Sequence, residues 1–138
     1  MEVTRRNAMF MGAGAFAVFG LPLRATTEDI EAITAFTGGA QMADSGVTLT
    51  APEIAENGNT VPIEVSAPGA AAVMVLALGN PTPNVATFNF GPLAASQAAS
   101  TRIRLAGTQD VVAIARMSDG SFAKATSTVK VTIGGCGG

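Results

Sequence analysis

The residue best suited to chemistry is the only cysteine of the sequence, Cys136, which has glycines on both sides. These are Gly134, Gly135, Gly137 and Gly138. Glycine imposes few steric limits on the backbone, so we expect a tail of this composition to stay mobile unless a partner binds it. Five extended residues span at most about 16–18 Å. The pattern predicts a swinging arm, residues 134–138, that carries cargo on its sulfur into narrow clefts of other proteins.

The same tail is poorly equipped to catalyse a reaction of its own. A cysteine is activated by a helix N-terminus, a neighbouring cation or a paired histidine, and the arm contains none of these. The chain has no histidine and no second cysteine, so a metal site at Cys136 would lack further ligands. We therefore predict no catalytic residues, no metal and no cofactor, and a thiol on which partner enzymes act.

Two other uses of the cysteine remain open on these grounds. One cysteine cannot form a disulfide within its own chain, but it can form one between two chains. Alternatively, the tail is a frayed end without a role. A buried structural role for Cys136 is disfavoured, because its glycine neighbours offer no side chains to pack around it.

The N-terminus has the pattern of an export signal. Arg5 and Arg6 precede an apolar run over residues 8–23, as the charged and apolar regions of a signal peptide do. The run is shorter than the roughly 20 apolar residues of a membrane-spanning helix, so the alternative of an uncleaved anchor is less favoured. The adjacent arginines predict the twin-arginine route to the periplasm. We assign residues 1–25 to this signal, with cleavage near Ala25, and expect no stable membrane association.

The charge balance of the remaining chain excludes one class of partner. Without residues 1–25 the sequence has 5 basic and 9 acidic residues, a net charge of about −4. It contains no basic patch and no aromatic array of the kind that binds nucleic acid. We therefore expect no nucleic-acid partner.

Residues 26–133 have the pattern of one all-β domain with a short helix at its start. Ile30, Ile33 and Phe36 recur at helical spacing and predict a helix over residues 27–37 that packs on the domain edge. From residue 47 onward the apolar period is two. Alternation predicts strands near residues 47–49, 61–66, 85–90, 102–105, 109–117 and 123–133, and the apolar run 70–78 predicts one strand covered on both faces.

About seven strands at this spacing, in roughly 100 residues, predict an immunoglobulin-like antiparallel β-sandwich. Asn57-Gly58 and Asp119-Gly120 are turn signals within it. The last strand ends at residue 133 and would give the arm a rigid base.

Two sets of charged residues could have a function beyond solubility. Arg102 and Arg104 lie two residues apart, so they share one face of a strand. They are either a solvated face or a means of steering an anionic cargo or an acidic partner. Glu53, Glu56 and Glu64 are interpreted as solubilising charge, because no spacing signal supports paired-carboxylate catalysis.

Three parts of the sequence resemble the SoxY family, the sulfur carriers of the bacterial periplasmic thiosulfate-oxidising (Sox) system. They are the twin-arginine leader, residues 51–58 (APEIAENG) running into Val61-Pro62-Ile63, and the terminal Val131-Thr132-Ile133-Gly134-Gly135-Cys136-Gly137-Gly138. The resemblance covers essentially the whole chain, and the terminal motif with its position is the most specific part. In the leader, Ala8-Met9 differ from the usual twin-arginine pattern.

The resemblance implies a cargo and a set of partners that the residue patterns do not show. Cys136 would be the covalent attachment point for sulfur intermediates. Haem c-type SoxXA would join thiosulfate to it as a cysteine S-thiosulfonate, the hydrolase SoxB would release sulfate, and the sulfane dehydrogenase SoxCD would oxidise the remaining sulfur. The chain would work as a heterodimer with SoxZ, a second β-sandwich without a leader of its own, and would be a carrier subunit rather than an enzyme.

Three rival functions make different predictions. An exported structural β-sandwich would use Cys136 only for an intermolecular disulfide. A cytosolic carrier of the ubiquitin-like type would hold sulfur on the carboxylate of Gly138, which the leader and the all-β pattern oppose. A thiol enzyme acting alone would turn over without partners.

Overall fold

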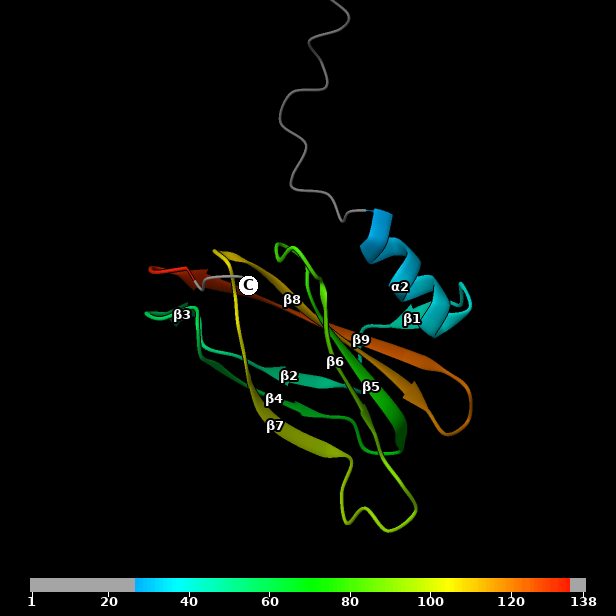
Figure 1. Cartoon of the computed structure of the whole chain (residues 1–138). Coiled ribbons are helices and arrows are strands. Elements are labelled where there is room, and N and C mark those ends of the chain that lie inside the picture. The colour runs from blue at the N-terminus through cyan, green and yellow to red at the C-terminus, as the bar shows by residue number, and fades with distance from the viewer. Residues whose placement is uncertain (1–26, 135–138) are drawn as a thin grey trace, which may run out of the picture.

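The structure of the chain, a computed structural model, describes residues 27–134 (Figure 1). The predicted export signal and most of the predicted arm, including Cys136, lie outside this range. Within it the chain forms one helix and nine strands. Their bounds are α2 (Thr27–Thr37), β1 (Met42–Ala43), β2 (Thr48–Thr50), β3 (Ile54–Ala55), β4 (Val61–Ser66), β5 (Ala70–Ala77), β6 (Asn84–Asn89), β7 (Ala98–Ile103), β8 (Gln109–Met117) and β9 (Phe122–Val131).

The strands form two sheets, which confirms the predicted β-sandwich. The larger sheet has the order β1-β9-β8-β5-β6, with β3 also pairing with β9, and the smaller sheet has the order β2-β4-β7. The seven predicted strands correspond to β2 and to β4 through β9. The two additional strands, β1 and β3, each have two residues and pair in parallel with β9. All other pairings are antiparallel, as predicted.

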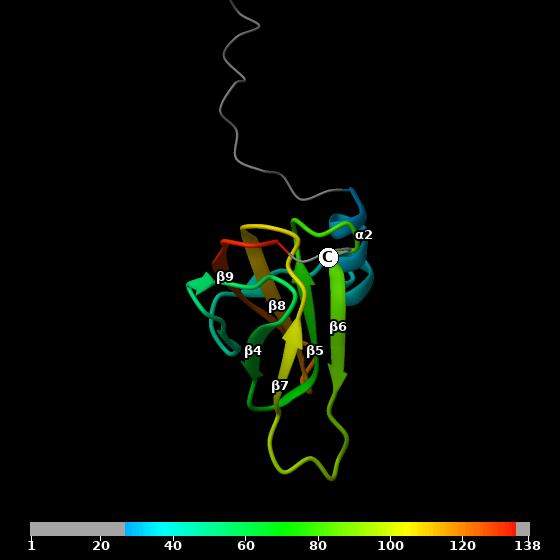
Figure 2. The ribbon, with the colours of Figure 1, turned by 60° about the vertical axis from the view of Figure 1, so that its left-hand side comes forward.

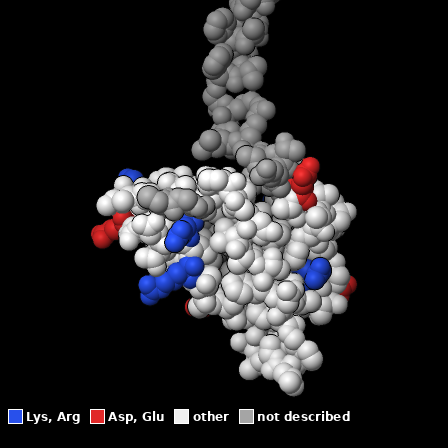
Figure 3. All heavy atoms as spheres, in the orientation of Figure 1, with Lys and Arg blue, Asp and Glu red and all other residues white. Residues whose placement is uncertain are grey.

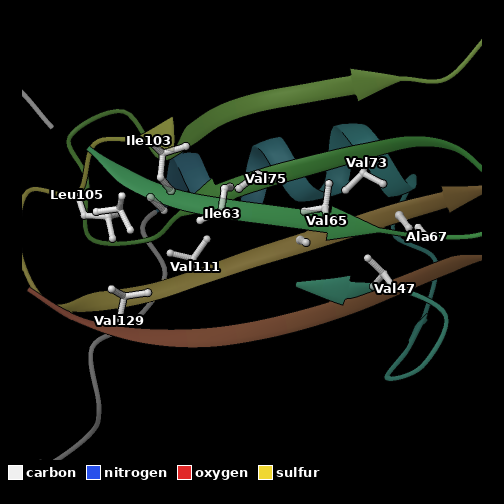
Figure 4. Packing of buried hydrophobic residues seen from close by; sticks show 14 of the residues in the cluster. Val47, Ile63, Val65, Ala67, Val73, Val75, Ile103, Leu105, Val111 and Val129 are labelled. Atoms are coloured by element: carbon white, nitrogen blue, oxygen red, sulfur yellow. The ribbon is translucent and has the colours of Figure 1, made fainter. Parts of the chain in front are cut away.

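The core between the sheets follows from the period-two alternation of the strands (Figure 4). In β4, Val61, Ile63 and Val65 are buried while Pro62 and Glu64 are exposed. Successive side chains of a strand point to opposite faces, so one face of the smaller sheet packs inward and the other faces solvent. The side chains that share this core come from both sheets. Among them are Val47, Ile103, Leu105, Val73, Val75, Val111 and Val129.

Strand β5 is buried on both faces, as its continuous apolar sequence predicts. Its second face holds Met74 and Leu76, which pack with Val112 and Ile114 of β8 against apolar side chains of α2, namely Ile33 and Phe36. Because β5 and β8 are inner strands of the larger sheet, α2 covers the outer face of that sheet (Figure 1). The bounds predicted for the helix are confirmed, but the prediction that it packs on the domain edge is wrong.

Aromatic and cationic contacts fix the helix on this face. The ring of Phe36 meets Phe122 of β9 edge to face, with centroids 6.1 Å apart. The guanidinium of Arg116 lies 5.1 Å from the centroid of Phe36. An edge-to-face pair and a cation–π contact each contribute about 0.5–1.5 kcal/mol beyond the area they bury. No helix within residues 27–134 is both long and apolar enough to cross a membrane.

The turn between β8 and β9 is the one predicted at Asp119-Gly120. Gly120 has a φ of 88°, which side chains with a Cβ rarely adopt. The hydroxyl and the backbone N–H of Ser121 both donate to the carboxylate of Asp119. These hydrogen bonds hold the pKa of Asp119 below its ordinary value, because they stabilise the charged form.

The packing of α2 on β5 predicts a large difference between two identical substitutions. Leu76 is fully buried under the helix, whereas Leu93, in the loop that projects between β6 and β7 (Figure 2), is 97% exposed. Leu76→Ala should lower the free energy of unfolding by about 2–5 kcal/mol through lost burial and a residual cavity. Leu93→Ala should change it by less than about 0.5 kcal/mol. Urea unfolding followed by circular dichroism measures both, and equal effects would contradict this packing.

Candidate functional site

The base of the predicted arm is the end of β9, and hydrogen bonds hold it on one side to the segment after β3. The backbone N–H of Thr132 donates to the carbonyl of Ala55 at 3.0 Å. The hydroxyl of Thr132 donates to the carbonyl of Glu56 at 3.0 Å. The N–H of Gly58 then donates to the carbonyl of Ile133 at 2.7 Å. The chain is therefore fixed up to Ile133, two residues beyond the end of the strand.

On its other side the end of β9 is held by a threonine side chain. The β8–β9 ladder stops at the pair Gln109–Val129, so Val131 has no backbone partner from β8. The hydroxyl of Thr108 takes that place. It accepts from the N–H of Val131 at 2.9 Å and lies 3.4 Å from the carbonyl of the same residue.

Two buried amide side chains, Asn80 and Gln109, order the connection between β7 and β8 that lies beside this base. Asn80 donates to the carbonyl of Arg104 at 2.7 Å and accepts from the N–H of Ala106 at 2.9 Å. Gln109 donates to the side-chain oxygen of Asn80 and to the carbonyl of Gly107, both at 2.9 Å. The sequence analysis did not identify this pair, because the two residues are 29 positions apart and no local pattern links them.

Gly134, the last residue described, touches this ordered connection. A Cβ on Gly134 would overlap the carbonyl oxygen of Ala106. The neighbouring Leu105 donates its N–H to the carbonyl of Gly58 at 2.8 Å, so both segments that flank the arm base are tied to each other. Glycine is required at position 134 by this close approach, in addition to any need for flexibility.

The structure describes only one of the predicted arm residues. Gly134 is exposed at the edge of the domain. Cys136, Gly135, Gly137 and Gly138, together with Arg5 and Arg6 of the export signal, lie outside the described residues. Their roles stay predictions.

The two arginines singled out by the sequence lie near the arm base. Arg102 and Arg104 are exposed, while Ile103 between them and Leu105 after them are buried, so both arginines point outward as predicted. The guanidinium of Arg102 is 3.5 Å from the hydroxyl of Thr60. In the view of Figure 3, basic and acidic side chains both lie on the left of a mostly uncharged face.

The predicted acidic residues do not form a catalytic pair. Glu64 accepts a hydrogen bond from the hydroxyl of Ser100 at 3.4 Å, and Glu53 and Glu56 are exposed. No group of three or more histidine, cysteine, aspartate or glutamate side chains within residues 27–134 is placed to hold a metal ion.

A groove of about 600 Å³ crosses the solvent-facing side of the smaller sheet. It is lined mainly by apolar surface, with Glu64 and Arg102 as its charged members. The lining residues are Thr50, Ala51, Pro52, Pro62, Ile63, Glu64, Ser100, Thr101 and Arg102. Glu64 and Ser100, which are hydrogen-bonded to each other, face each other across the two strands that line it.

Comparison with known proteins first defines the class. A superoxide reductase (neelaredoxin) from Ignicoccus hospitalis matches with a TM-score of 0.56 and 16% identity, over 63% of this chain and 80% of its own. A superoxide reductase from Archaeoglobus fulgidus matches with a TM-score of 0.51 and 10% identity, over 64% and 90%. These likenesses show the fold alone. The chain is thus an all-β sandwich protein of a type shared by proteins of different function.

The family is more specific than the fold. The structure of the sulfur carrier protein SoxY from Chlorobium limicola f thiosulfatophilum matches with a TM-score of 0.65 and 36% identity, over 75% of this chain and 96% of its own. The family model described as sulfur oxidation protein SoxY matches residues 33–136. The search of curated proteins found no match. The chain belongs to the SoxY family, which confirms the resemblance inferred from the sequence.

The contact of Gly134 with Ala106 predicts that an added methyl group moves the arm base. Gly134→Ala should shift the amide resonances of Ala106 and Gly58 and lower the free energy of unfolding by about 1 kcal/mol, since it overpacks a fixed contact. The control is Gly91→Ala, because a Cβ there meets nothing within 4 Å. Nitrogen–proton correlation spectra and urea unfolding measure both variants. Unchanged resonances in Gly134→Ala would contradict the contact.

Proposed function

We propose that this chain is a carrier of sulfur intermediates, with the cargo bonded to the thiol of Cys136 and presented to partner enzymes. The observation that carries the proposal is the family match, because the matched residues 33–136 include the cysteine. The SoxY from Chlorobium limicola is itself a sulfur carrier protein. The lack of any second cysteine or any histidine in the sequence supports a passive carrier rather than an enzyme.

The loading step is an oxidation that needs an external electron acceptor. The cysteine thiol and thiosulfate form a new S–S bond, giving a cysteine S-thiosulfonate (Cys–S–S–SO₃⁻), one proton and two electrons. The electrons pass to a haem c-type SoxXA partner. Sulfur attached to a thiol in this way is ordinary disulfide-type chemistry, and this chain needs only to supply the sulfur atom.

The unloading steps also place the chemistry on partners. Addition of water to the terminal sulfone, by a SoxB-type hydrolase, breaks the bond between the two sulfurs of the former thiosulfate. It yields sulfate, a proton and a cysteine persulfide. A SoxCD-type sulfane dehydrogenase would then oxidise the outer sulfur of the persulfide with three water molecules, giving Cys–S–SO₃⁻ and seven protons and passing six electrons to an external acceptor. A tethered cargo does not diffuse away between these steps, so its effective concentration at each partner stays high.

The arm base suits this role because it is ordered up to Ile133. Thr132 and Ile133 are hydrogen-bonded to the segment after β3, so the carrier presents its arm from a fixed place. No described contact activates a nucleophile there, and a partner must therefore supply the reacting groups.

The partner subunit and the location are further parts of the proposal. We infer a heterodimer with a SoxZ-type β-sandwich subunit in the periplasm, reached through the twin-arginine route. Membership of the SoxY family supports the first inference, and the Arg5-Arg6 pair before an apolar run supports the second. Because that route carries folded complexes, one leader would export both subunits.

If Cys136 is the attachment site, its thiol alone determines whether the chain acquires thiosulfate-derived adducts. Protein from thiosulfate-grown cells should show a mass increase of one thiosulfate or its oxidation products on the peptide containing Cys136, and reductant should remove it. Cys136→Ser should lose every such adduct and reduce thiosulfate oxidation at least 100-fold, whereas Gly91→Ala, which leaves the arm unchanged and adds a methyl group in open space, should retain both. Intact-mass analysis and thiosulfate consumption measure these outcomes. If Cys136→Ser lost only a covalent dimer and still supported oxidation, the structural β-sandwich would be the better function.

The leader predicts that two conservative changes stop the export of both subunits. Arg5→Lys with Arg6→Lys keeps the charge but removes the paired arginines that the twin-arginine route reads. We expect this chain and its SoxZ-type partner to stay together in the cytoplasm, recovered as one complex by affinity capture. Cell fractionation with immunoblotting measures this. Recovery of this chain without a partner would contradict the heterodimer. Normal export of the variant would contradict the twin-arginine route.

A further inference from the structure

Arg102 and Arg104 are held on a fixed backbone and lack a described role. Ile103 and Leu105 are buried in the core, at 5% and 0% exposure, so the alternation aims both arginines at solvent. The carbonyl of Arg104 is fixed by the side chain of Asn80, and the next residue is tied to Gly58. The two guanidinium groups therefore start from well-ordered positions.

Neither arginine forms an ion pair with another residue of the described range 27–134. Among residues 27–134, the one interaction of either guanidinium is the contact of Arg102 with the hydroxyl of Thr60 at 3.5 Å. Glu64, on the same face of the sheet, pairs in register with Ser100 and accepts a hydrogen bond from its hydroxyl. Two neighbouring guanidinium groups that form no ion pair with the described residues can bind an anion, even on a domain with a net charge of about −4.

The number of residues between Gly134 and Cys136 is large enough for cargo on the cysteine to reach these cations. Gly134 touches the carbonyl of Ala106, and Ala106 is two residues from Arg104, a backbone separation of at most about 7 Å. Cys136 is two residues from Gly134, again at most about 7 Å. An extended arm that turns toward β7 therefore brings a group on the sulfur to Arg104, and a longer group toward Arg102.

We propose that Arg102 and Arg104 form a binding site for the sulfonate end of the cargo carried on Cys136. The inference rests on the proposed function, because it needs an arm loaded with a sulfur oxoanion. A guanidinium matches an oxoanion through paired N–H donors, so the site distinguishes an arm that ends in a sulfonate from one that ends in a neutral thiol. The loaded arm then rests against its own domain between encounters.

The test uses synthetic cargo of opposite charge and no Sox enzyme. Methanethiosulfonate reagents transfer –S–CH₂CH₂–X to the thiolate, with methanesulfinate as the leaving group. X is either sulfonate or trimethylammonium. The measured quantity is the ratio of the two rates at Cys136, for the wild type and for the double variant Arg102→Gln with Arg104→Gln.

We expect the double variant to lower the anionic-to-cationic rate ratio by about three- to ten-fold at low ionic strength, because two nearby charges act on the reagent in water. In 1 M salt the difference should fall to less than about 1.5-fold. Lys124→Gln is the matched control, since Lys124 pairs with Ile114 at the opposite end of β9, about 30 Å of strand away from Gly134. It should leave the ratio unchanged.

A second measurement tests docking itself. In the wild type carrying the sulfonate adduct, the side-chain Nε–Hε resonances of Arg102 and Arg104 should shift relative to the trimethylammonium adduct. Equal rate ratios in the wild type and the double variant, together with unshifted resonances, would overturn the site. If the synthetic adduct does not dock but the double variant impairs cargo transfer by a partner, the arginines serve an acidic partner surface instead, which also overturns it.

The outcomes separate this inference from the proposed function. Thiosulfate loading of Cys136 in cells depends on the proposed function and is read by intact mass. Docking of the synthetic sulfonate depends only on the arginines. Loading without docking removes the arginine site alone, and docking without loading removes the proposed function while leaving an anion site at the arm base.

Discussion

The hydrogen bonds on both flanks of the last residues of β9 are the constraint on which the molecule depends. On one flank Thr132 and Ile133 bond to the segment after β3, and on the other Val131 bonds to the hydroxyl of Thr108. Strand ends normally fray because their outer groups can exchange protein partners for water. Here the closing strand of the larger sheet stays paired beyond its own end, so everything attached after Gly134 starts from one place.

The buried amide side chains of Asn80 and Gln109 stabilise the β7–β8 connection, which lies beside these last residues of β9. Asn80 and Gln109 are 7% and 6% exposed and hold the β7–β8 connection through their side chains. A buried polar group left without a partner costs about 1–3 kcal/mol, so such a pair is tolerated only when its hydrogen bonds are made. With its hydrogen bonds made, the pair holds the β7–β8 connection in one conformation beside the arm base. Arg104, which carries part of the proposed anion site, belongs to that connection.

Local sequence patterns predicted most of the helices and strands, but they could not predict contacts between residues far apart in the chain. The apolar run of β5 correctly indicated burial on both faces, and helical spacing gave the bounds of α2. Strands β1 and β3 could not be predicted, because two residues have no period and their partner is far along the chain.

The sequence also placed the strand around Ile103 a few residues late. Ala98, Ala99 and Ser100 give little β signal, and their pairing with β4 decides the outcome. The Asn80–Gln109 contact spans 29 residues and leaves no local mark. Cys136 was singled out because the sequence has no other thiol, and its role stays a prediction.

The short free length after Ile133 has a consequence for the order of events in a multi-enzyme system. With the backbone bonded through Ile133, the sulfur of Cys136 extends no more than about 10 Å beyond the fixed chain. Under the proposed function, every partner enzyme that acts on cargo bound to Cys136 must bind the same small area of this domain. Two catalysts cannot occupy that area together, so the carrier must leave one before it visits the next. Dissociation rates, rather than the chemistry alone, would set the pace of such a relay.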